Sequence, residues 1–334
     1  MSAPTAAPRR PAPPAHPGHF EGNTHTRLAV CPLGPAAVAD PAAWATENLP
    51  SLLGVLRRHG ALLLRGFPTD PARFEELAAA IGGPPLDYTE RSTPRSTVAG
   101  RVYTSTAYPP DQTIPLHNES SYASRPPGTV YFLCAEAAPT GGATPIADGR
   151  AVLRLLPPDL VDRFRAGVLY TRVYREGLGL SWQEGFQSED PHEVEERCRA
   201  AGIAFEWTGD GALRTRHHRP ALVTDPAGGA EAWFNQAHLF HSSALEPEVR
   251  EALLEMYGEQ DLPRNAYFAD GTPIPDADLA AVRAAYDEAA FAFPWQEGDL
   301  LILDNLLVAH GREPFTGPRQ VLVAMTGPAG GNRP

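Results

Sequence analysis

The chain has 334 residues, 43% of them hydrophobic and 20% charged, which is enough apolar material for one large domain or one domain with insertions. Acidic residues outnumber basic ones by 40 to 28 and give a net charge of −12, so we expect no nucleic-acid partner, because phosphate binding needs clustered Lys and Arg. No apolar run approaches the roughly 18 residues of a membrane span, and the three cysteines form no paired motif, so we expect a reduced, cytoplasmic protein with no membrane partner.

The first segment of the chain is rich in proline and alanine. Six prolines and five alanines stand within the first twenty positions, a composition that cannot bury apolar surface. We therefore expect residues 1–26 to be a disordered tail and residues 27–334 to form a single domain.

Two helices and a buried strand are predicted next. Asp40 begins a helical pattern in which leucines recur near every 3.6 residues, and Gly60 ends it. Residues 61–67 are typical of a buried strand. Asp70 is a cap for a second helix, which has Pro71 at its first position.

The rest of the chain is strand-rich around a mixed middle part. Residues 129–134 are continuously apolar and β-branched, as in a strand buried on both faces. Residues from about 150 to 290 read as a long insertion, with helices expected at 193–201, 246–258 and 276–290 and strands at 168–174, 212–217 and 232–234. Strands return at 291–293, 300–303, 306–309 and 320–325. Short strands with many turns, made by 36 prolines and 30 glycines, predict a mainly β fold with flanking helices and a jelly-roll core.

One strand-like run carries the most distinctive pair of side chains. Residues 114–122 read Ile-Pro-Leu-His-Asn-Glu-Ser-Ser-Tyr, which places His117 and Glu119 two positions apart. On an extended strand such residues project to the same face and can converge on one ion. An imidazole and a carboxylate are two members of the facial triad that binds iron(II), and this triad needs one more histidine.

His310 is the candidate for that third ligand, because a barrel brings distant strands together. Two other histidine groups compete with it. His217 and His218 are neighbours and point to opposite faces of a strand, so they would rarely share one ion. His238 and His241 could chelate a metal on a helix, but no carboxylate stands close to them.

These motifs together resemble a known enzyme family. Besides residues 117–122, the likeness rests on Thr144 within Gly-Gly-Ala-Thr-Pro-Ile-Ala-Asp (141–148), on His310 within residues 298–312, and on Arg319. They are similar to the taurine dioxygenase and clavaminate synthase superfamily of iron(II)- and 2-oxoglutarate-dependent oxygenases, over residues 45–326. The resemblance implies a double-stranded β-helix (jelly-roll) core, with Fe(II) and O2 used together with the co-substrate 2-oxoglutarate.

The resemblance also implies residue roles. His117, Glu119 and His310 would be the catalytic metal ligands, while Arg319 and Thr144 would bind the distal carboxylate of 2-oxoglutarate. A guanidinium offers a planar fork for such a carboxylate, which a lysine cannot reproduce. The alternatives are a surface arginine and an ordinary turn hydroxyl. Asn118 and Asp304 are candidates for supporting the ligands and are explained equally well as structural polar residues.

Within the superfamily the motifs look most like amino-acid hydroxylases of peptide natural-product pathways, including antibiotic biosynthesis. We therefore expect an amino-acid-like small-molecule substrate, free or tethered to a peptidyl carrier protein. Arg91, Asn235 and His238 are the candidate anchors for it. Glu119 argues against halogenation, because halogenating relatives have a small apolar residue at that position.

Several alternatives stay open at this stage. Desaturation, epoxidation or cyclisation would use the same cofactors as hydroxylation, and the substrate could instead be another carboxylate or a sulfonate. A protein of a different class, a non-catalytic jelly roll that binds 2-oxoglutarate, would keep the same fold. A zinc hydrolase is disfavoured by the pair Thr144 and Arg319. The oligomeric state is left open.

Overall fold

The computed structural model describes residues 18–87, 96–105, 108–225 and 229–328. Its larger sheet follows from the apolar runs read in the sequence and is mostly antiparallel, with β2 and β3 parallel. In spatial order its strands are β1 (His19–Gly22), β2 (Arg27–Pro32), β3 (Ala61–Arg65), β16 (Leu300–Asp304), β7 (Pro127–Glu136), β19 (Gln320–Pro328), β5 (Val102–Thr104) and β4 (Thr97–Ala99).

A smaller sheet faces this one and completes the jelly-roll core. It has the order β6 (Ile114–His117), β17 (Val308–Arg312) and β9 (Ile146–Asp148). A separate two-stranded sheet pairs β18 (Phe315–Thr316) with β8 (Thr140–Gly141). Strand β17 is central and pairs with β6 and β9. The predicted mainly β fold is therefore confirmed.

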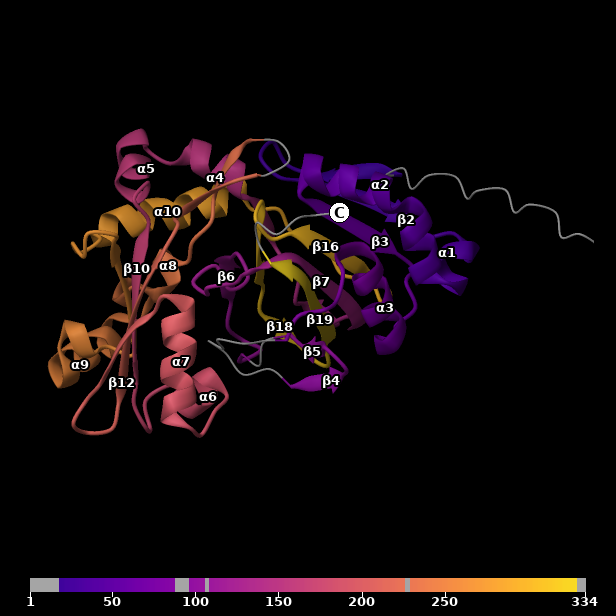
Figure 1. Ribbon diagram of the computed structural model, residues 1–334. Coiled ribbons are helices and arrows are strands. Elements are labelled where there is room, and N and C mark those ends of the chain that lie inside the picture. Colours follow the sequence, from indigo (N-terminus) through magenta and orange to yellow (C-terminus); the bar gives the residue numbers. More distant parts are fainter. Residues whose placement is uncertain (1–17, 88–95, 106–107, 226–228, 329–334) are drawn as a thin grey trace, which may run out of the picture.

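The larger sheet is buried on both faces. Successive strand residues point to opposite sides of the sheet, and the two sides belong to different core clusters. Leu62 belongs to a core cluster with Phe74, on the face covered by helices α2 (Pro41–His59) and α3 (Pro71–Gly82). Leu63 belongs to a second cluster with Val308 of the smaller sheet. Burying each such leucine contributes roughly 1.5–3 kcal/mol, so the larger sheet is fixed between the helix layer (Figure 1) and the smaller sheet that carries β17.

The predicted helix ends are confirmed in the first part of the chain. The Asp40 carboxylate accepts a hydrogen bond from the amide of Ala43 at the start of α2, and Gly60 ends that helix with φ +74°. Asp70 accepts from the amides of Ala72 and Arg73 at the start of α3. The short helix α1 (Pro35–Ala39) precedes them.

The middle of the chain forms a separate lobe beside the core, on the left in Figure 1. Its sheet has the order β11 (Ala204–Trp207), β12 (Leu213–Arg219), β10 (Val168–Tyr174) and β15 (Arg264–Phe268), and a hairpin pairs β13 (Leu222–Thr224) with β14 (Glu231–Trp233). The helices of this part are α4 (Gly149–Leu155), α5 (Pro158–Phe164), α6 (Trp182–Phe186), α7 (Pro191–Ala201), α8 (Ala237–Phe240), α9 (Pro247–Tyr257) and α10 (Asp276–Ala289), with 3-10 turns at Ser242–Ala244 and Glu259–Asp261. The division of the chain into a tail and one domain with this insertion stays a prediction.

The structure corrects the sequence prediction at several places. Residues His19–Gly22, within the expected tail, form β1 paired with β2, and Phe20 packs against the ring of His59. Residues 291–293 make a single bridge, between Phe291 and Ile146, instead of a strand. The strand expected at 306–309 begins later, at Val308, because residues 305–307 form a turn. Short apolar runs do not separate strands from buried loops.

Among the described residues, no helix has both the length and the apolar character needed to cross a membrane.

Candidate metal centre

Strand pairing brings together two histidines that are far apart in the sequence. His117 ends β6 and stands directly opposite His310 of β17 in the antiparallel register. Their ring centroids are 4.5 Å apart, and His310 also packs on Phe132 of β7 at 4.8 Å. Between His310 and Arg312 the strand has an irregularity, where Gly311 comes so close to β6 that a Cβ there would lie 2.7 Å from the carbonyl oxygen of Ile114.

Glu119 reaches the same place by a different route from the one predicted. It lies beyond the end of β6, so a regular strand does not carry the pair as the sequence suggested, and the next residue, Ser120, has φ +51°. The Asn305 side chain determines the backbone position instead. Its Oδ1 accepts from the Glu119 amide at 2.7 Å, and its Nδ2 donates to the Glu119 carbonyl oxygen at 2.9 Å.

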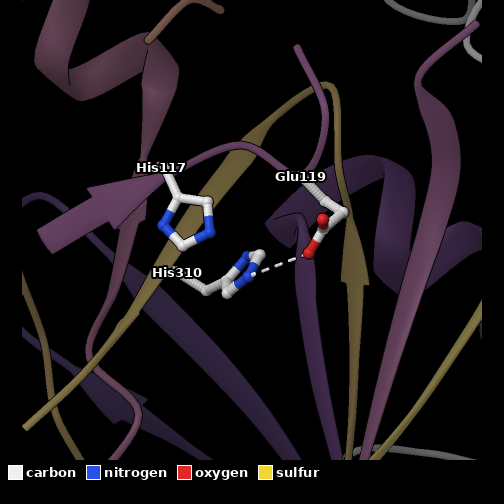
Figure 2. A group of neighbouring side chains, drawn as sticks. All are labelled: His117, Glu119 and His310. Carbon is white, nitrogen blue, oxygen red and sulfur yellow. Dashed lines mark ion pairs between the residues drawn. The ribbon is translucent and has the colours of Figure 1, made fainter. Parts of the chain in front are cut away.

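The three side chains converge, as Figure 2 shows. One ligand atom from each of His117, Glu119 and His310 lies within 4.8 Å of the others. His310 Nε2 lies 3.7 Å from Glu119 Oε2. Glu119 and His310 are 3% and 5% exposed. This burial keeps water away from these two side chains, while His117 is partly exposed.

The chemistry of this donor set fits iron(II). The Nδ1 atom of His117 lies 2.8 Å from the carbonyl oxygen of Pro115, which can only accept, so Nδ1 carries the proton and Nε2 carries the lone pair. Two imidazoles and one carboxylate on adjacent structural elements form the 2-His-1-carboxylate set that leaves coordination positions open for ligands. The residues present therefore suit the iron that the sequence led us to expect.

A second polar group surrounds Arg319, the residue directly before β19. Arg319 donates from Nε to the carbonyl oxygen of Gly142 at 3.0 Å and lies 5.3 Å from the ring of Phe315. Burial and the nearby charge of Arg312 lower the pKa of Arg319 to about 10, so it remains charged at neutral pH. No carboxylate of the described residues forms an ion pair with Arg319. A half-buried cation in this state is suited to pairing with an anion.

Thr144 belongs to the same loop as Gly142, the residue that Arg319 contacts. It lies two residues beyond Gly142, whose carbonyl holds Arg319, and it is 3% exposed. Its hydroxyl oxygen accepts a hydrogen bond from Nε1 of Trp295 at 3.0 Å. Because that bond uses an oxygen lone pair, the hydroxyl hydrogen is left to donate, as a carboxylate ligand requires.

Comparison with known proteins identifies the family. Residues 27–326 match the model of the family described as "Taurine catabolism dioxygenase TauD, TfdA family". The chain belongs to the TauD/TfdA family. The predicted resemblance is thereby confirmed over nearly the whole chain.

Two relatives support this membership. The chain is 45% identical over 276 residues to the dapdiamide synthesis protein DdaC of Enterobacter agglomerans, which covers 82% of this chain and 84% of that protein. It is 33% identical over 284 residues to a clavaminate synthase-like protein of Arabidopsis thaliana, covering 81% of this chain and 82% of the relative.

Solved structures show that this TauD/TfdA chain shares its fold with other oxygenases. An asparagine oxygenase in complex with Fe(II), 2S,3S-3-hydroxyasparagine and succinate matches with a TM-score of 0.56 and 17% identity, over 89% of this chain and 93% of that one. The PvcB protein of Pseudomonas aeruginosa matches with a TM-score of 0.51 and 19% identity, over 89% and 84%. As a member of its family, the protein is a dioxygenase that uses iron(II), 2-oxoglutarate and O2.

The remaining predicted site residues lie elsewhere or make structural contacts. Arg91 is outside the described residues. Asn235 is fully buried, donates to the carbonyl oxygen of Ala221 at 3.1 Å and accepts from the amide of Ala237 at 3.0 Å. His238 Nε2 donates to the carbonyl oxygen of Leu116 at 2.9 Å, and burial lowers the pKa of His238 to about 3. The substrate role of Asn235 and His238 stays a prediction.

The competing histidines do not form a second centre. Among the described residues, the triad is the sole group of three or more His, Cys, Asp or Glu side chains that could hold a metal. His241 bonds to Ser243, and His217 lies on β12 in the insertion sheet. Asn118 donates to the carbonyl oxygen of Asn305 at 2.7 Å, and Asp304 accepts from the amide of Leu306, so the supporting role of both residues stays a prediction.

Two residues of the site were not predicted from the sequence. Asn305, which determines the backbone position of Glu119, and Trp295, which bonds to Thr144, both lie near the last core strands. The signal for Asn305 was a polar pair, Asp304 and Asn305, between two apolar runs. Such a polar pair marks a turn, and its buried amide needs partners from elsewhere in the fold.

Proposed function

We propose that this dioxygenase hydroxylates a C–H bond of an amino acid or an amino-acid-derived substrate in a peptide natural-product pathway. The observation that carries the proposal is the converging group of His117, Glu119 and His310 in a chain that is 45% identical to a dapdiamide synthesis protein. The asparagine oxygenase with the same fold holds a hydroxylated amino acid and succinate, which is consistent with this substrate class.

In this proposal the triad binds the metal. His117 keeps its Nε2 lone pair toward the centre because Nδ1 is engaged by the carbonyl oxygen of Pro115. Glu119 is positioned through its own backbone by Asn305, and His310 is positioned by its place in the middle strand of the smaller sheet. Iron(II) and 2-oxoglutarate, when bound, would let O2 act as the oxidant: one oxygen atom would enter succinate, formed with CO2 from 2-oxoglutarate, and the other would enter the substrate.

Arg319 and Thr144 then hold the distal carboxylate of 2-oxoglutarate. The Gly142 carbonyl receives the Arg319 Nε hydrogen and orients the guanidinium, so its remaining N–H groups can pair with the carboxylate in a fork. Trp295 orients the Thr144 hydroxyl as a donor. Because these groups are largely buried, an anion that enters replaces water with fixed hydrogen bonds and stays in one orientation.

Two finer features complete the proposal. We propose that the substrate is free or tethered to a peptidyl carrier protein, and that the enzyme works in a reducing cytoplasm. The three cysteines, Cys31, Cys134 and Cys198, are buried and form no disulfide in the described part of the chain, which suits a reducing compartment. Burial also raises the pKa of Cys134 to about 11, so its thiol is unreactive at neutral pH.

A substrate panel tests the proposal. The protein is incubated with iron(II), 2-oxoglutarate and O2, together with free amino acids, carrier-bound aminoacyl thioesters, taurine and aryloxyacetates. We expect succinate to form together with a product that has gained one oxygen, for a member of the amino-acid groups. Glu119→Ala is the control and should form neither. Coupled turnover with taurine or an aryloxyacetate alone would overturn the substrate class.

A further inference from the structure

Two arginines stand side by side in the insertion lobe. Arg172 of β10 and Arg264 of β15 are direct partners in the antiparallel register, so their side chains leave the sheet on the same face. Like charges directly opposite each other on paired strands are destabilising. A pair in this arrangement is expected where an anion is bound at least part of the time.

Aromatic side chains surround the two arginines. The Arg172 guanidinium lies 4.7 Å from the ring of Tyr122 and 4.9 Å from the ring of Phe240, and it donates to the hydroxyl of Tyr174 at 3.2 Å. Arg264 lies 5.7 Å from the same Phe240 ring. The aromatic faces hold both cations in place.

Arg264 has no anionic partner. None of the carboxylates in the described ranges forms an ion pair or a hydrogen bond with it, although it is an exposed side chain of an acidic protein. Surrounding protein atoms, followed by the charge of Arg172, lower the pKa of the Arg264 guanidinium. It is therefore a cation that water reaches but that protein atoms crowd, as expected for a group inside a cleft.

That cleft is a cavity of about 190 Å³, lined by both arginines and Phe240. Leucines form much of its remaining wall, namely Leu178, Leu180, Leu245, Leu253 and Leu262. A ligand that fits it has an anionic group at one end and apolar carbon beside that group.

A short chain of contacts links the cavity to the metal centre. Tyr122 follows Glu119 by three residues, and its ring lies 5.1 Å from that of Phe240. Phe240 ends α8, and Gln236 at the start of the same helix donates from Nε2 to the carbonyl oxygen of Asn118 at 2.6 Å. Strand β6 lies between the lobe that carries β10 and α8 and the core strands (Figure 1).

We propose that Arg172 and Arg264 form the subsite that binds a carboxylate of the substrate, with its carbon chain running past Tyr122 to the metal centre. The inference rests on the proposed function for the identity of the substrate, but the subsite itself is a property of the two arginines and their cavity. It makes Arg264 a residue that determines specificity for acids over their uncharged amides.

The test uses hexanoate, a carboxylate with a short apolar chain, and hexanamide as its uncharged match. Binding is measured by calorimetry without oxygen, with saturating iron(II) and 2-oxoglutarate, so that the Arg319 pocket is filled and no turnover occurs. We expect hexanoate to bind, hexanamide not to bind, and Arg264→Gln to weaken hexanoate binding at least tenfold, with Arg264→Lys intermediate. Arg216→Gln is the matched control: Arg216 pairs with Thr171 on the opposite face of the same sheet, so its loss should leave binding unchanged.

Equal hexanoate binding by the parent and Arg264→Gln would overturn the subsite, as would binding that Arg216→Gln weakens to the same extent, or no binding to the parent. These outcomes are independent of the substrate panel. If the panel yields no hydroxylated amino acid while Arg264→Gln still binds hexanoate at least tenfold more weakly than the parent, the proposed function fails and the carboxylate subsite stands.

Discussion

Replacing Asn305 by alanine should separate a residue that positions the metal ligand from one that merely stabilises the fold. The side chain is fully buried, and its amide makes three hydrogen bonds: from the Glu119 amide at 2.7 Å, to the Glu119 carbonyl at 2.9 Å and to the Pro127 carbonyl at 2.8 Å. Each bond contributes about 1 kcal/mol, and the backbone groups left behind are buried, so we expect a total loss of about 3–5 kcal/mol.

The effect on the metal should exceed what stability alone explains. Without Asn305 the backbone of Glu119, which stands outside any strand, loses both of its bonds to that side chain, so the carboxylate no longer has one fixed position. Loss of such a supporting contact typically lowers metal affinity by about 10–100-fold. Iron(II) affinity is measured by anaerobic titration, and stability by urea unfolding of the metal-free protein.

Asn265→Ala is the matched control. Asn265 is also buried and makes three bonds, accepting from the amides of Ser242 and Ala266 and donating to the Tyr267 hydroxyl, but it lies on β15. It should lower stability by a similar amount and leave iron affinity unchanged. The reasoning would be refuted if Asn305→Ala bound iron as tightly as the parent, or if both variants lost iron to the same degree.

Four further outcomes are expected. His117→Ala, Glu119→Ala and His310→Ala should each abolish iron binding with the metal-free protein still folded, and any one that binds iron like the parent is not a ligand. Arg319→Lys should raise the KM for 2-oxoglutarate by roughly 5–150-fold, because about 1–3 kcal/mol of bidentate bonding is lost. Thr144→Val should raise this KM less. An unchanged KM in Arg319→Lys would remove Arg319 from the co-substrate site. Gly142→Ala should also raise this KM, because its φ is +73° and the new Cβ would lie 3.0 Å from Cδ of Arg319, whereas Gly209→Ala, where nothing lies within 4 Å, should not. Burial lowers the pKa of His217 to about 4, so between pH 6.5 and 4 this imidazole is protonated in the unfolded chain but not in the folded protein. The free energy of unfolding should therefore fall as the pH drops through this range, by up to about 1.4 kcal/mol per pH unit. His217→Gln should flatten that slope in urea unfolding.

Local sequence signals predicted the elements whose ends are determined by local contacts. Asp40, Gly60 and Asp70 act through amides within four residues of them, so the caps of α2 and α3 could be read directly. The bounds of β10 were also predicted, because its alternating buried residues produce a visible pattern. The strand expected at 291–293 failed because burial of Phe293 in the core needs no strand partner.

The site was predicted in its residue types and not in its construction. The spacing of His117 and Glu119 suggested one strand, while the structure ends β6 at His117 and uses Asn305, far along the chain, to hold Glu119. The direct pairing of Arg172 with Arg264 depends on the register between β10 and β15. A register between strands that are distant in sequence is determined by tertiary packing, so single-sequence patterns do not contain it.

The most direct test of the central claim follows the two atoms of molecular oxygen. The enzyme is supplied with iron(II), 2-oxoglutarate, the amino-acid substrate found in the panel and ¹⁸O2 in ordinary water, and both products are examined by mass spectrometry. A 2-oxoglutarate-dependent hydroxylase should place one labelled atom in succinate and the other in the hydroxylated amino acid, in equal amounts, and Glu119→Ala should give neither. A hydroxyl group that carries oxygen from water, or a product formed without succinate, would contradict the account.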